Sequence, residues 1–319
     1  MVQLLPVSAI VPTRHRPAPL REMFESLAQQ SAQPVEAIVV DASDDRATEQ
    51  LCAESFAGLE TKVRYFKATE RGAATQRNQA VGYASELEGI LFLDDDITFE
   101  PDCLKRMWLA FQNDPKLGGA NATITNCQYF PPGRFSSLLF QYLNGGREES
   151  YAGKCIGPVM NLLPEDRPEL PEVVPVEWIN TTCALYRRAA LPDPPFPNHF
   201  TGYSLMEDVT LSLTVGKQWK LANARTARIY HDSQPGDHKN NAAVLAKMDL
   251  VNRYYVMTEI LDRQTADDRV KLVAQQLFSV AASLTSSRGW MELPLVLWGK
   301  VGAISEIAAS ANTRQTQTS

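Results

Sequence analysis

The sequence predicts an α/β fold with a mixed, mostly parallel sheet flanked by helices and a helical C-terminal extension. Strand-like and helix-like segments alternate over the first 125 residues, the strand-like segments are continuously apolar, and polar clusters follow several of them. Strands that are buried on both faces form unbroken apolar runs, and their alternation with helices is typical of parallel sheets. The chain has 319 residues, of which 44% are hydrophobic and 21% are charged, so it can bury a core of this kind.

Apolar runs and the 3.6-residue periodicity of helices assign the individual elements. The expected strands of the first half are 7–11, 35–40, 63–66 and 90–93, and the expected helices are 20–27, 46–56, 72–87 and 101–111. Residues 126–175 are rich in proline, glycine and polar residues and are expected to form an irregular insertion. Strands at 176–180, 183–186 and 225–230 and a helix at 205–215 follow. Helical patterns then continue to the C-terminus.

Charge and cysteine content exclude several classes of protein. The net charge is −6, which argues against a generally basic surface for binding nucleic acid. The five cysteines are an odd number without any CxxC pair, so a disulfide framework or a cysteine zinc site is not expected. The N-terminus has no basic region before its apolar run, and no tract offers the roughly 18 apolar residues of a membrane span. These features predict a cytoplasmic protein with reduced thiols.

Polar residues follow three of the expected strands, where parallel sheets bind their ligands. These are Thr13-Arg14, Asp41 and the run Asp94-Asp95-Asp96. Two carboxylates about 4 Å apart repel by roughly 4 kcal/mol at an effective dielectric constant near 20, so a run of three favours a cation among them. Oxygen ligands suit Mg²⁺ or Mn²⁺, and the alternation of side chains places Asp94 and Asp96 on one face. The alternative is a solvated acidic turn before the next helix.

Five segments carry a resemblance to a known family, in order over residues 7–231. They are AIVPTRHRP, AIVVDASDD, RGAATQRNQAV, GILFLDDDI and GYSLMEDVTLSLTV. Together they resemble family 2 glycosyltransferases with the GT-A fold. The resemblance implies a UDP-, GDP- or dTDP-sugar donor, Mn²⁺ or Mg²⁺ held through a DxD motif, and inversion at the transferred sugar carbon. It also implies a saccharide or polyprenyl-linked acceptor and a place in polysaccharide biosynthesis.

The resemblance assigns the donor site residue by residue. The implied donor contacts are Pro12, Thr13, Arg14, Asp41, Gly72, Arg77, Asn78, Asp94 and Asp95. Asp41 would bind the base, Arg77 would supply a cation near the phosphates, and Asp94 would meet the ribose or the sugar. Ala42-Ser43 follows Asp41 where the family has aspartate or asparagine and then glycine, so the choice of base stays open. An exposed helix arginine is the structural alternative for Arg77.

The resemblance also assigns the metal, the base and the acceptor side. Asp96 and His231 would hold the metal, although a lone histidine is often structural. Inverting transfer needs a general base outside the metal cluster, and Asp208 takes that role, with Glu207 orienting the acceptor or Asp208. Plain capping of a helix N-terminus is the alternative for this pair. Two residues are implied on the acceptor side, Trp178 and Thr181.

The resemblance also implies how the chain divides into domains. Residues 1–235 would form a GT-A catalytic domain, with a nucleotide-sugar-binding half (1–125) and an acceptor-binding half (126–235). A helical extension (236–308) and a flexible tail (309–319) would follow. In the extension, an apolar stripe on one helix precedes a segment with two tryptophans and basic flanks. This composition is typical of an interfacial segment, so we expect peripheral contact with the inner face of the cell membrane, a homodimer interface, or packing on the catalytic domain.

Three other functions would each require different residues. A sugar-phosphate nucleotidyltransferase needs a glycine-rich loop after the first strand, and PTRHRP is not one. A Rossmann dehydrogenase needs GxGxxG at the same place. A non-catalytic sugar- or nucleotide-binding subunit stays open, although the intact aspartate cluster and the Glu207-Asp208 pair speak against it.

Overall fold

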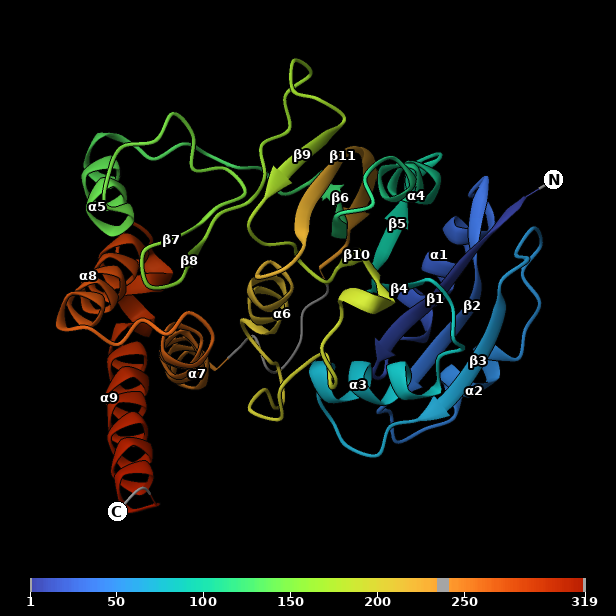
Figure 1. Cartoon of the computed structure of the whole chain (residues 1–319). Helices are drawn as coiled ribbons and strands as arrows, with labels where there is room; N and C mark the ends of the chain where they lie inside the picture. Colours follow the sequence, from blue (N-terminus) through green and yellow to red (C-terminus); the bar gives the residue numbers. More distant parts are fainter. Residues whose placement is uncertain (1, 234–240, 318–319) are drawn as a thin grey trace. The chain divides into compact units, whose positions relative to one another are not determined.

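A nine-stranded mixed sheet forms the centre of the first half of the computed structural model, which describes residues 2–233 and 241–317 (Figure 1). Its strands are β1 (Gln3–Thr13), β2 (Ala32–Asp41), β3 (Lys62–Lys67), β4 (Gly89–Leu93), β5 (Ile97–Phe99), β6 (Leu117–Ile124), β9 (Val173–Val176), β10 (Cys183–Arg187) and β11 (Lys220–His231). They pair in the order β3-β2-β1-β4-β10-β6-β11-β5, with β9 on β11.

The direction of the strands confirms the predicted mixed, mostly parallel sheet. β1 runs parallel to β2 and β4, and β2 runs parallel to β3. β10 is antiparallel to both β4 and β6, so β4 and β6 point the same way, and β11 is parallel to β6. The carboxyl ends of β1, β2, β3, β4, β6 and β11 therefore share one edge of the sheet, and β10 runs the other way.

Helices cover both faces of this sheet, as the apolar strands predicted. Five helices belong here: α1 (Pro17–Ala28), α2 (Ala47–Cys52), α3 (Ala73–Tyr83), α4 (Cys103–Asn113) and α6 (Glu207–Val215). α1, α2 and α4 share one core cluster with alternate strand residues such as Val11 and Leu93. On the other face the ring of Phe92 contacts those of Tyr186 and Phe196. The two faces together hold β1 and β4 in place beneath the site.

Several parts of this fold differ from the expectation, among them β5, β6, β9 and the strand expected at 176–180. β6 was not predicted, because its sequence LGGANATI contains two glycines and no apolar run. Those glycines are required by packing, since a Cβ on Gly118 would lie 2.4 Å from the Cβ of Trp219, and one on Gly119 2.8 Å from the ring of Tyr186. The strand expected at 176–180 is wrong beyond Val176. There the amide of Ile179 bonds to the hydroxyl of Ser212 in place of a neighbouring strand.

The chain divides into two compact units, and the sheet belongs to the first, Met1–Phe130 with Ala152–Lys154 and Leu162–Gln234. The second unit is Pro131–Tyr151, Cys155–Asn161 and Pro235–Ser319. It contains the hairpin of β7 (Cys155–Ile156) and β8 (Met160–Asn161) and four α-helices, α5 (Arg134–Asn144), α7 (Ala242–Tyr255), α8 (Ala266–Ser283) and α9 (Ser287–Gln317), in its described residues. α5 was not predicted and lies in the segment expected to be irregular.

Local sequence explains how the helices of the second unit begin and pack. α8 starts with a capping box, in which Thr265 and Asp268 exchange side-chain to backbone hydrogen bonds. α9 approaches α7 so closely that a Cβ on Gly299 would lie 2.1 Å from the carbonyl oxygen of Ala243. Among the described residues, no helix combines the length and hydrophobicity needed to span a membrane. The flexible tail at 309–319 stays a prediction.

Candidate active site

The carboxyl edge of the sheet collects the polar residues that the sequence singled out. Thr13 ends β1, Asp41 ends β2, Asp94 follows β4 and His231 ends β11. The amide of Asp94 donates to the carbonyl oxygen of Thr182 at 2.9 Å, which fixes the aspartate run against the start of β10. All these residues lie in the first unit.

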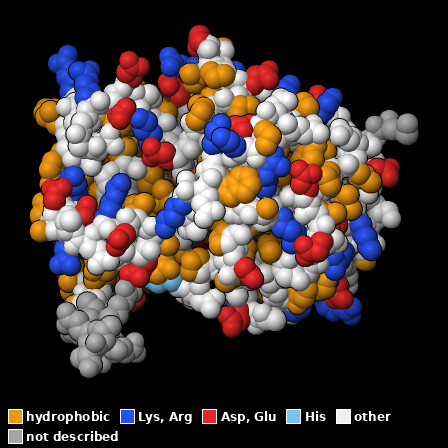
Figure 2. All heavy atoms as spheres, in the orientation of Figure 1, with side chains coloured by type: hydrophobic (Ala, Val, Ile, Leu, Met, Phe, Trp, Pro, Cys, Tyr) orange, Lys and Arg blue, Asp and Glu red, His pale blue; other side chains and the backbone are white. Residues whose placement is uncertain are grey.

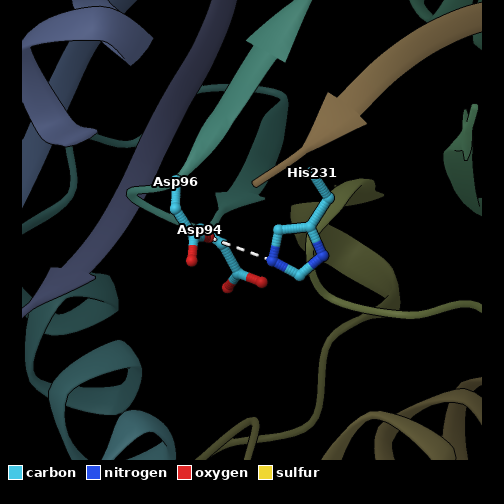
Figure 3. Close-up of side chains that lie close together, drawn as sticks. All are labelled: Asp94, Asp96 and His231. Carbon is cyan, nitrogen blue, oxygen red and sulfur yellow. Dashed lines mark ion pairs between the residues drawn. The ribbon is translucent and has the colours of Figure 1, made fainter. Parts of the chain in front are cut away.

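Three of these side chains form a cluster that could hold a metal ion. Asp94, Asp96 and His231 each present one ligand atom, and these atoms all lie within 4.8 Å of one another (Figure 3). His231 reaches the aspartates because β11 pairs with β5, which puts His231 opposite Ile97. Its Nε2 lies 3.0 Å from Oδ1 of Asp96. Two carboxylates and an imidazole suit Mn²⁺ or Mg²⁺, so the residues present fit the expected cation.

Asp95 is directed to a different set of partners. Its Oδ2 accepts a hydrogen bond from Thr13 Oγ1 at 2.5 Å, and its Oδ1 lies 3.3 Å from Nη1 of Arg16. The same nitrogen lies 3.0 Å from Oδ2 of Asp96. Burial raises the pKa of Asp95 to about 7, against the lowering effects of Thr13 and Arg16. Arg16 therefore provides the positive charge that the aspartate run needs.

Sequence reasoning missed Arg16 and chose Arg14 from the same motif. Arg14 is exposed, whereas Arg16 turns back from the start of α1 toward the carboxylates. Both are arginines directly after β1, and nothing in their spacing distinguished them. Tyr203 was also not singled out from the sequence. Burial raises its pKa, and the negative charges of Asp94 and Asp208 add to that effect.

Arg77 links the metal cluster to the Glu207-Asp208 pair. Its side chain is 4% exposed, and Nη2 donates to Oδ1 of Asp94 at 2.7 Å. Nη1 donates to Oε1 of Glu207. The guanidinium also lies over the ring of Phe196, 5.9 Å from its centroid. In this structure Arg77 therefore joins two carboxylates from opposite sides of the site.

We expect Arg77→Ala to lower the free energy of unfolding by about 3–5 kcal/mol, because it leaves a buried carboxylate without its partner. Arg77→Lys should cost less, since lysine keeps the charge but cannot donate to two carboxylates in the same fixed geometry. Chemical denaturation measures both. Arg14→Ala is the matched control, and its exposed side chain predicts a change within about 0.5 kcal/mol. Equal effects of the two alanine variants would contradict a stabilising role of the Arg77 bridge.

Asp208 and Glu207 open α6 next to this bridge. Desolvation raises the pKa of Asp208 to about 6, and the charge of Asp94 adds to the effect, while Val209 and Arg77 oppose it. The amide of Val209 donates to Oδ1 of Asp208 at 2.8 Å. Glu207 is buried, and its second oxygen accepts no hydrogen bond from any residue that the structure describes. A carboxylate with a pKa near 6 is ionised at neutral pH and still binds a proton readily.

The remaining residues that were predicted to bind the nucleotide-sugar donor lie around β1, β2 and α3. Asp41 is buried, and it accepts hydrogen bonds from the amide of Ser43 at 2.8 Å and from the hydroxyl of Tyr65 at 3.2 Å. Asn78 uses both amide atoms on the backbone of Phe196, at 2.7 and 3.0 Å. In this structure the side chain of Asn78 thus holds a loop beside the site.

The other predicted site residues lie in the sheet, at a close backbone contact or in the core. They are Pro12, Gly72 and the two residues implied on the acceptor side, Trp178 and Thr181. Pro12 is partly buried within β1, and Gly72 has a φ of +150° where it meets Gly202 in a backbone bridge. Glycine suits this close approach because it has no Cβ. Trp178 and Thr181 are both buried, and the indole of Trp178 donates to the carbonyl oxygen of Leu162 at 2.7 Å.

Comparison with known proteins relates the first half of the chain to a family of enzymes. Residues 8–159 match the model of the family described as Glycosyl transferase family 2. The match spans just under half of the chain, and it indicates a family 2 glycosyltransferase domain there. An uncharacterized glycosyltransferase of Haemophilus influenzae is 33% identical to the chain over 112 residues. That match spans 35% of this chain and 36% of the relative, so it covers about a third of the relative's length.

Solved glycosyltransferases share the fold of the domain. The S. aureus TarS 1–349 structure in complex with UDP-GlcNAc has a TM-score of 0.54 and 18% identity, and the match covers 92% of this chain and 79% of that one. The mannosyltransferase PcManGT from Pyrobaculum calidifontis, in complex with GDP-Man and Mn²⁺, has a TM-score of 0.52 and 17% identity, over 98% and 89% of the two chains. At these identities the likeness concerns the fold, and it confirms the predicted GT-A fold.

Proposed function

We propose that this chain is an inverting glycosyltransferase that moves a sugar from a nucleotide-sugar donor to a saccharide or lipid-linked acceptor. The cluster of Asp94, Asp96 and His231 at the carboxyl edge of a family 2 domain carries this proposal. It is supported by the neighbours in fold, since TarS is described with UDP-GlcNAc and PcManGT with GDP-Man and Mn²⁺. The donor is a UDP-, GDP- or dTDP-sugar, and Asp41 is our candidate for binding its base.

Asp94, Asp96 and His231 would hold Mn²⁺ or Mg²⁺. A divalent cation held by these residues would neutralise the charge that develops on the departing nucleoside diphosphate. Arg16 and Thr13 hold the aspartate run in position for that task, because they occupy both oxygens of Asp95. The chain thus keeps Asp95 turned toward β1 and α1 while its two neighbours face His231.

Asp208 is our candidate for the general base. It takes the proton from the acceptor hydroxyl, whose oxygen forms a bond to the anomeric carbon of the donor sugar. The bond from that carbon to the diphosphate oxygen breaks, the nucleoside diphosphate leaves with the electron pair, and the configuration inverts. The amide of Val209 holds Oδ1, so we assign proton transfer to Oδ2. Glu207, held by Arg77, positions the first turn of α6.

Release of nucleoside diphosphate from a panel of UDP-, GDP- and dTDP-sugars with Mn²⁺ tests this function. We expect one donor to release its diphosphate, faster with an acceptor present. A nucleotidyltransferase would instead release pyrophosphate from a nucleoside triphosphate and a sugar phosphate. A non-catalytic subunit would bind a nucleotide sugar without turnover, and either result would overturn the proposal.

The partners that we propose are the donor and a saccharide or polyprenyl-linked acceptor of polysaccharide biosynthesis, and not nucleic acid. Figure 2 shows basic and acidic side chains interspersed over one face of the molecule. The formal net charge of −6 also disfavours association with a polyanion. A cytoplasmic location is part of this proposal, because nucleotide sugars and reduced thiols are both found there.

An uncharged face of α9 is our candidate for a peripheral membrane contact. It consists of Trp290, Leu297, Trp298, Val301 and Ile304, and the two tryptophans are 61% and 74% exposed. The charged side chains of α9 that the structure describes lie off this face and pair within the second unit. Three such pairs are Arg288–Glu292, Lys247–Glu306 and Lys300–Asp249. Tryptophan among apolar residues on an amphipathic helix favours the boundary of a lipid surface, so we commit to lipid over a second copy of the chain.

Vesicle sedimentation tests this contact. The full chain should co-sediment with phosphatidylcholine vesicles and do so independently of salt, since the face carries no charge. Trp290→Ser combined with Trp298→Ser should abolish sedimentation, whereas Val244→Ser, an exposed apolar residue on α7, should not. Protein that stays in the supernatant, or that forms a dimer by light scattering through the two tryptophans, would contradict the lipid assignment.

A further inference from the structure

A cavity of about 190 Å³ lies within the first unit, beyond the carboxyl end of β6. It is lined by the end of β6 and the residues after it, by the loop 163–167, and by Asn180 and Arg228. Its volume is below the roughly 300–1,000 Å³ of pockets for drug-sized ligands, so it suits a single small ring.

The walls of this cavity are joined to the metal cluster on two sides. Asn126, between two lining residues, donates to the carbonyl oxygen of His231 at 2.9 Å and accepts from its amide at 3.2 Å. Asn180 lies two residues before Thr182, whose carbonyl oxygen accepts from the amide of Asp94 at 2.9 Å. The backbones of two of the three candidate metal ligands are therefore bonded to residues that lie within two positions of the lining.

The charges that line the cavity are already paired with one another. Glu165 lies 3.0 Å from Arg167, and Asp166 lies 2.6 Å from Arg228. Arg228 also lies 3.3 Å from Glu100. The four charged lining residues are two acidic and two basic, so they sum to zero. An anionic or cationic ligand would have to break these pairs, whereas a neutral ligand would not.

The uncharged part of the lining offers hydrogen-bonding groups and an aromatic ring. Oδ1 of Asn180 is buried and has no hydrogen-bond donor among the residues that the structure describes. A buried acceptor left without a donor costs about 1–3 kcal/mol, which a ligand hydroxyl at this point would recover. Thr125 and Tyr129 add a hydroxyl and a ring face, and both suit a sugar.

We propose that this cavity binds one uncharged sugar residue of the acceptor, with a hydroxyl of that sugar donating to Oδ1 of Asn180. The proposal rests on the proposed function and deepens it, because it names a neutral saccharide as the acceptor class. It places the acceptor on the His231 side of the metal cluster. Sugar phosphates and uronic acids are excluded from the cavity by its paired charges.

Cys127 supplies a readout that needs no knowledge of the true acceptor. It is an exposed free thiol in the lining of the cavity, whereas Cys52 is only partly exposed and lies elsewhere in the same unit. The rate of alkylation of Cys127 by N-ethylmaleimide is measured by mass spectrometry with methyl glycosides of glucose, galactose, mannose and N-acetylglucosamine. Glucuronic acid and glucose 6-phosphate serve as charged probes. We expect at least one neutral glycoside to slow alkylation of Cys127 severalfold without slowing that of Cys52, and neither charged probe to do so.

Asn180→Leu, which removes the acceptor oxygen, should abolish the protection, and Asn180→Ser is the milder variant if leucine unfolds the chain. Protection by no neutral glycoside, equal protection by the charged probes, or unchanged protection in both variants would overturn the proposal. Diphosphate release from the donor panel is measured on the same wild-type protein. Release without protection refutes the sugar cavity alone, and protection without release refutes the glycosyltransferase function alone.

Discussion

Asp208→Asn is expected to lower kcat by about 10²-fold or more and to leave the affinity for the donor nearly unchanged. Asparagine keeps the size of the side chain and can keep the hydrogen bond from Val209, but it cannot take a proton at neutral pH. The loss should therefore appear in the chemical step. Single-turnover measurement of diphosphate release, with donor binding measured separately by calorimetry, distinguishes the two quantities.

The pH profile gives a second signature of the same residue. Burial raises the pKa of Asp208 to about 6, so the carboxyl is protonated and inactive as a base below that pH and ionised above it. The wild-type rate should rise with pH through about 6, and this acidic limb should be absent from Asp208→Asn. Asp267→Asn, in the exposed first turn of α8, is the matched control and should behave as wild type. Loss of donor affinity with kcat retained would move Asp208 to the donor site.

Asp96→Asn is expected to weaken Mn²⁺ binding by at least about 100-fold, because losing even an outer-shell partner of a metal site costs 10–100-fold. Asp96 faces both His231 and Arg16, and asparagine keeps its shape but not its charge. Removal of the cation with EDTA should likewise abolish most turnover by the wild type. Asp45→Asn, an exposed carboxylate, is the matched control for Mn²⁺ titration by calorimetry. Full turnover in EDTA would refute the metal assignment.

The strands and the residues at their carboxyl ends could be predicted because both depend on local sequence. Apolar runs mark β1, β2 and β4, and the polar residue that follows each run lies at the edge where the strands end. The partners of those residues depend on pairings between distant segments. His231 meets Asp96 only because β11 pairs with β5, and Arg77 meets Glu207, 130 positions away, only because α6 begins beside α3.

β6 and α5 show the other limit of sequence reasoning. The glycines of β6 look like a turn until Trp219 and Tyr186 are placed against them, and α5 lies in a stretch whose composition suggested no regular structure. The role of Arg16 was not predicted for a similar reason. Its role depends on the direction in which the chain leaves β1, and the motif PTRHRP does not show that direction.

The guanidinium shared by Asp94 and Glu207 also makes these two carboxylates energetically dependent on each other. When one of them is neutralised, Arg77 has a single carboxylate left to balance, and the interaction energy of that remaining ion pair changes. The effects of Asp94→Asn and Glu207→Gln on stability should then fail to add, by about 0.5–3 kcal/mol in a double-mutant cycle. Asp94 in the candidate metal cluster and Glu207 beside the candidate base cannot vary independently in sequence while Arg77 serves both.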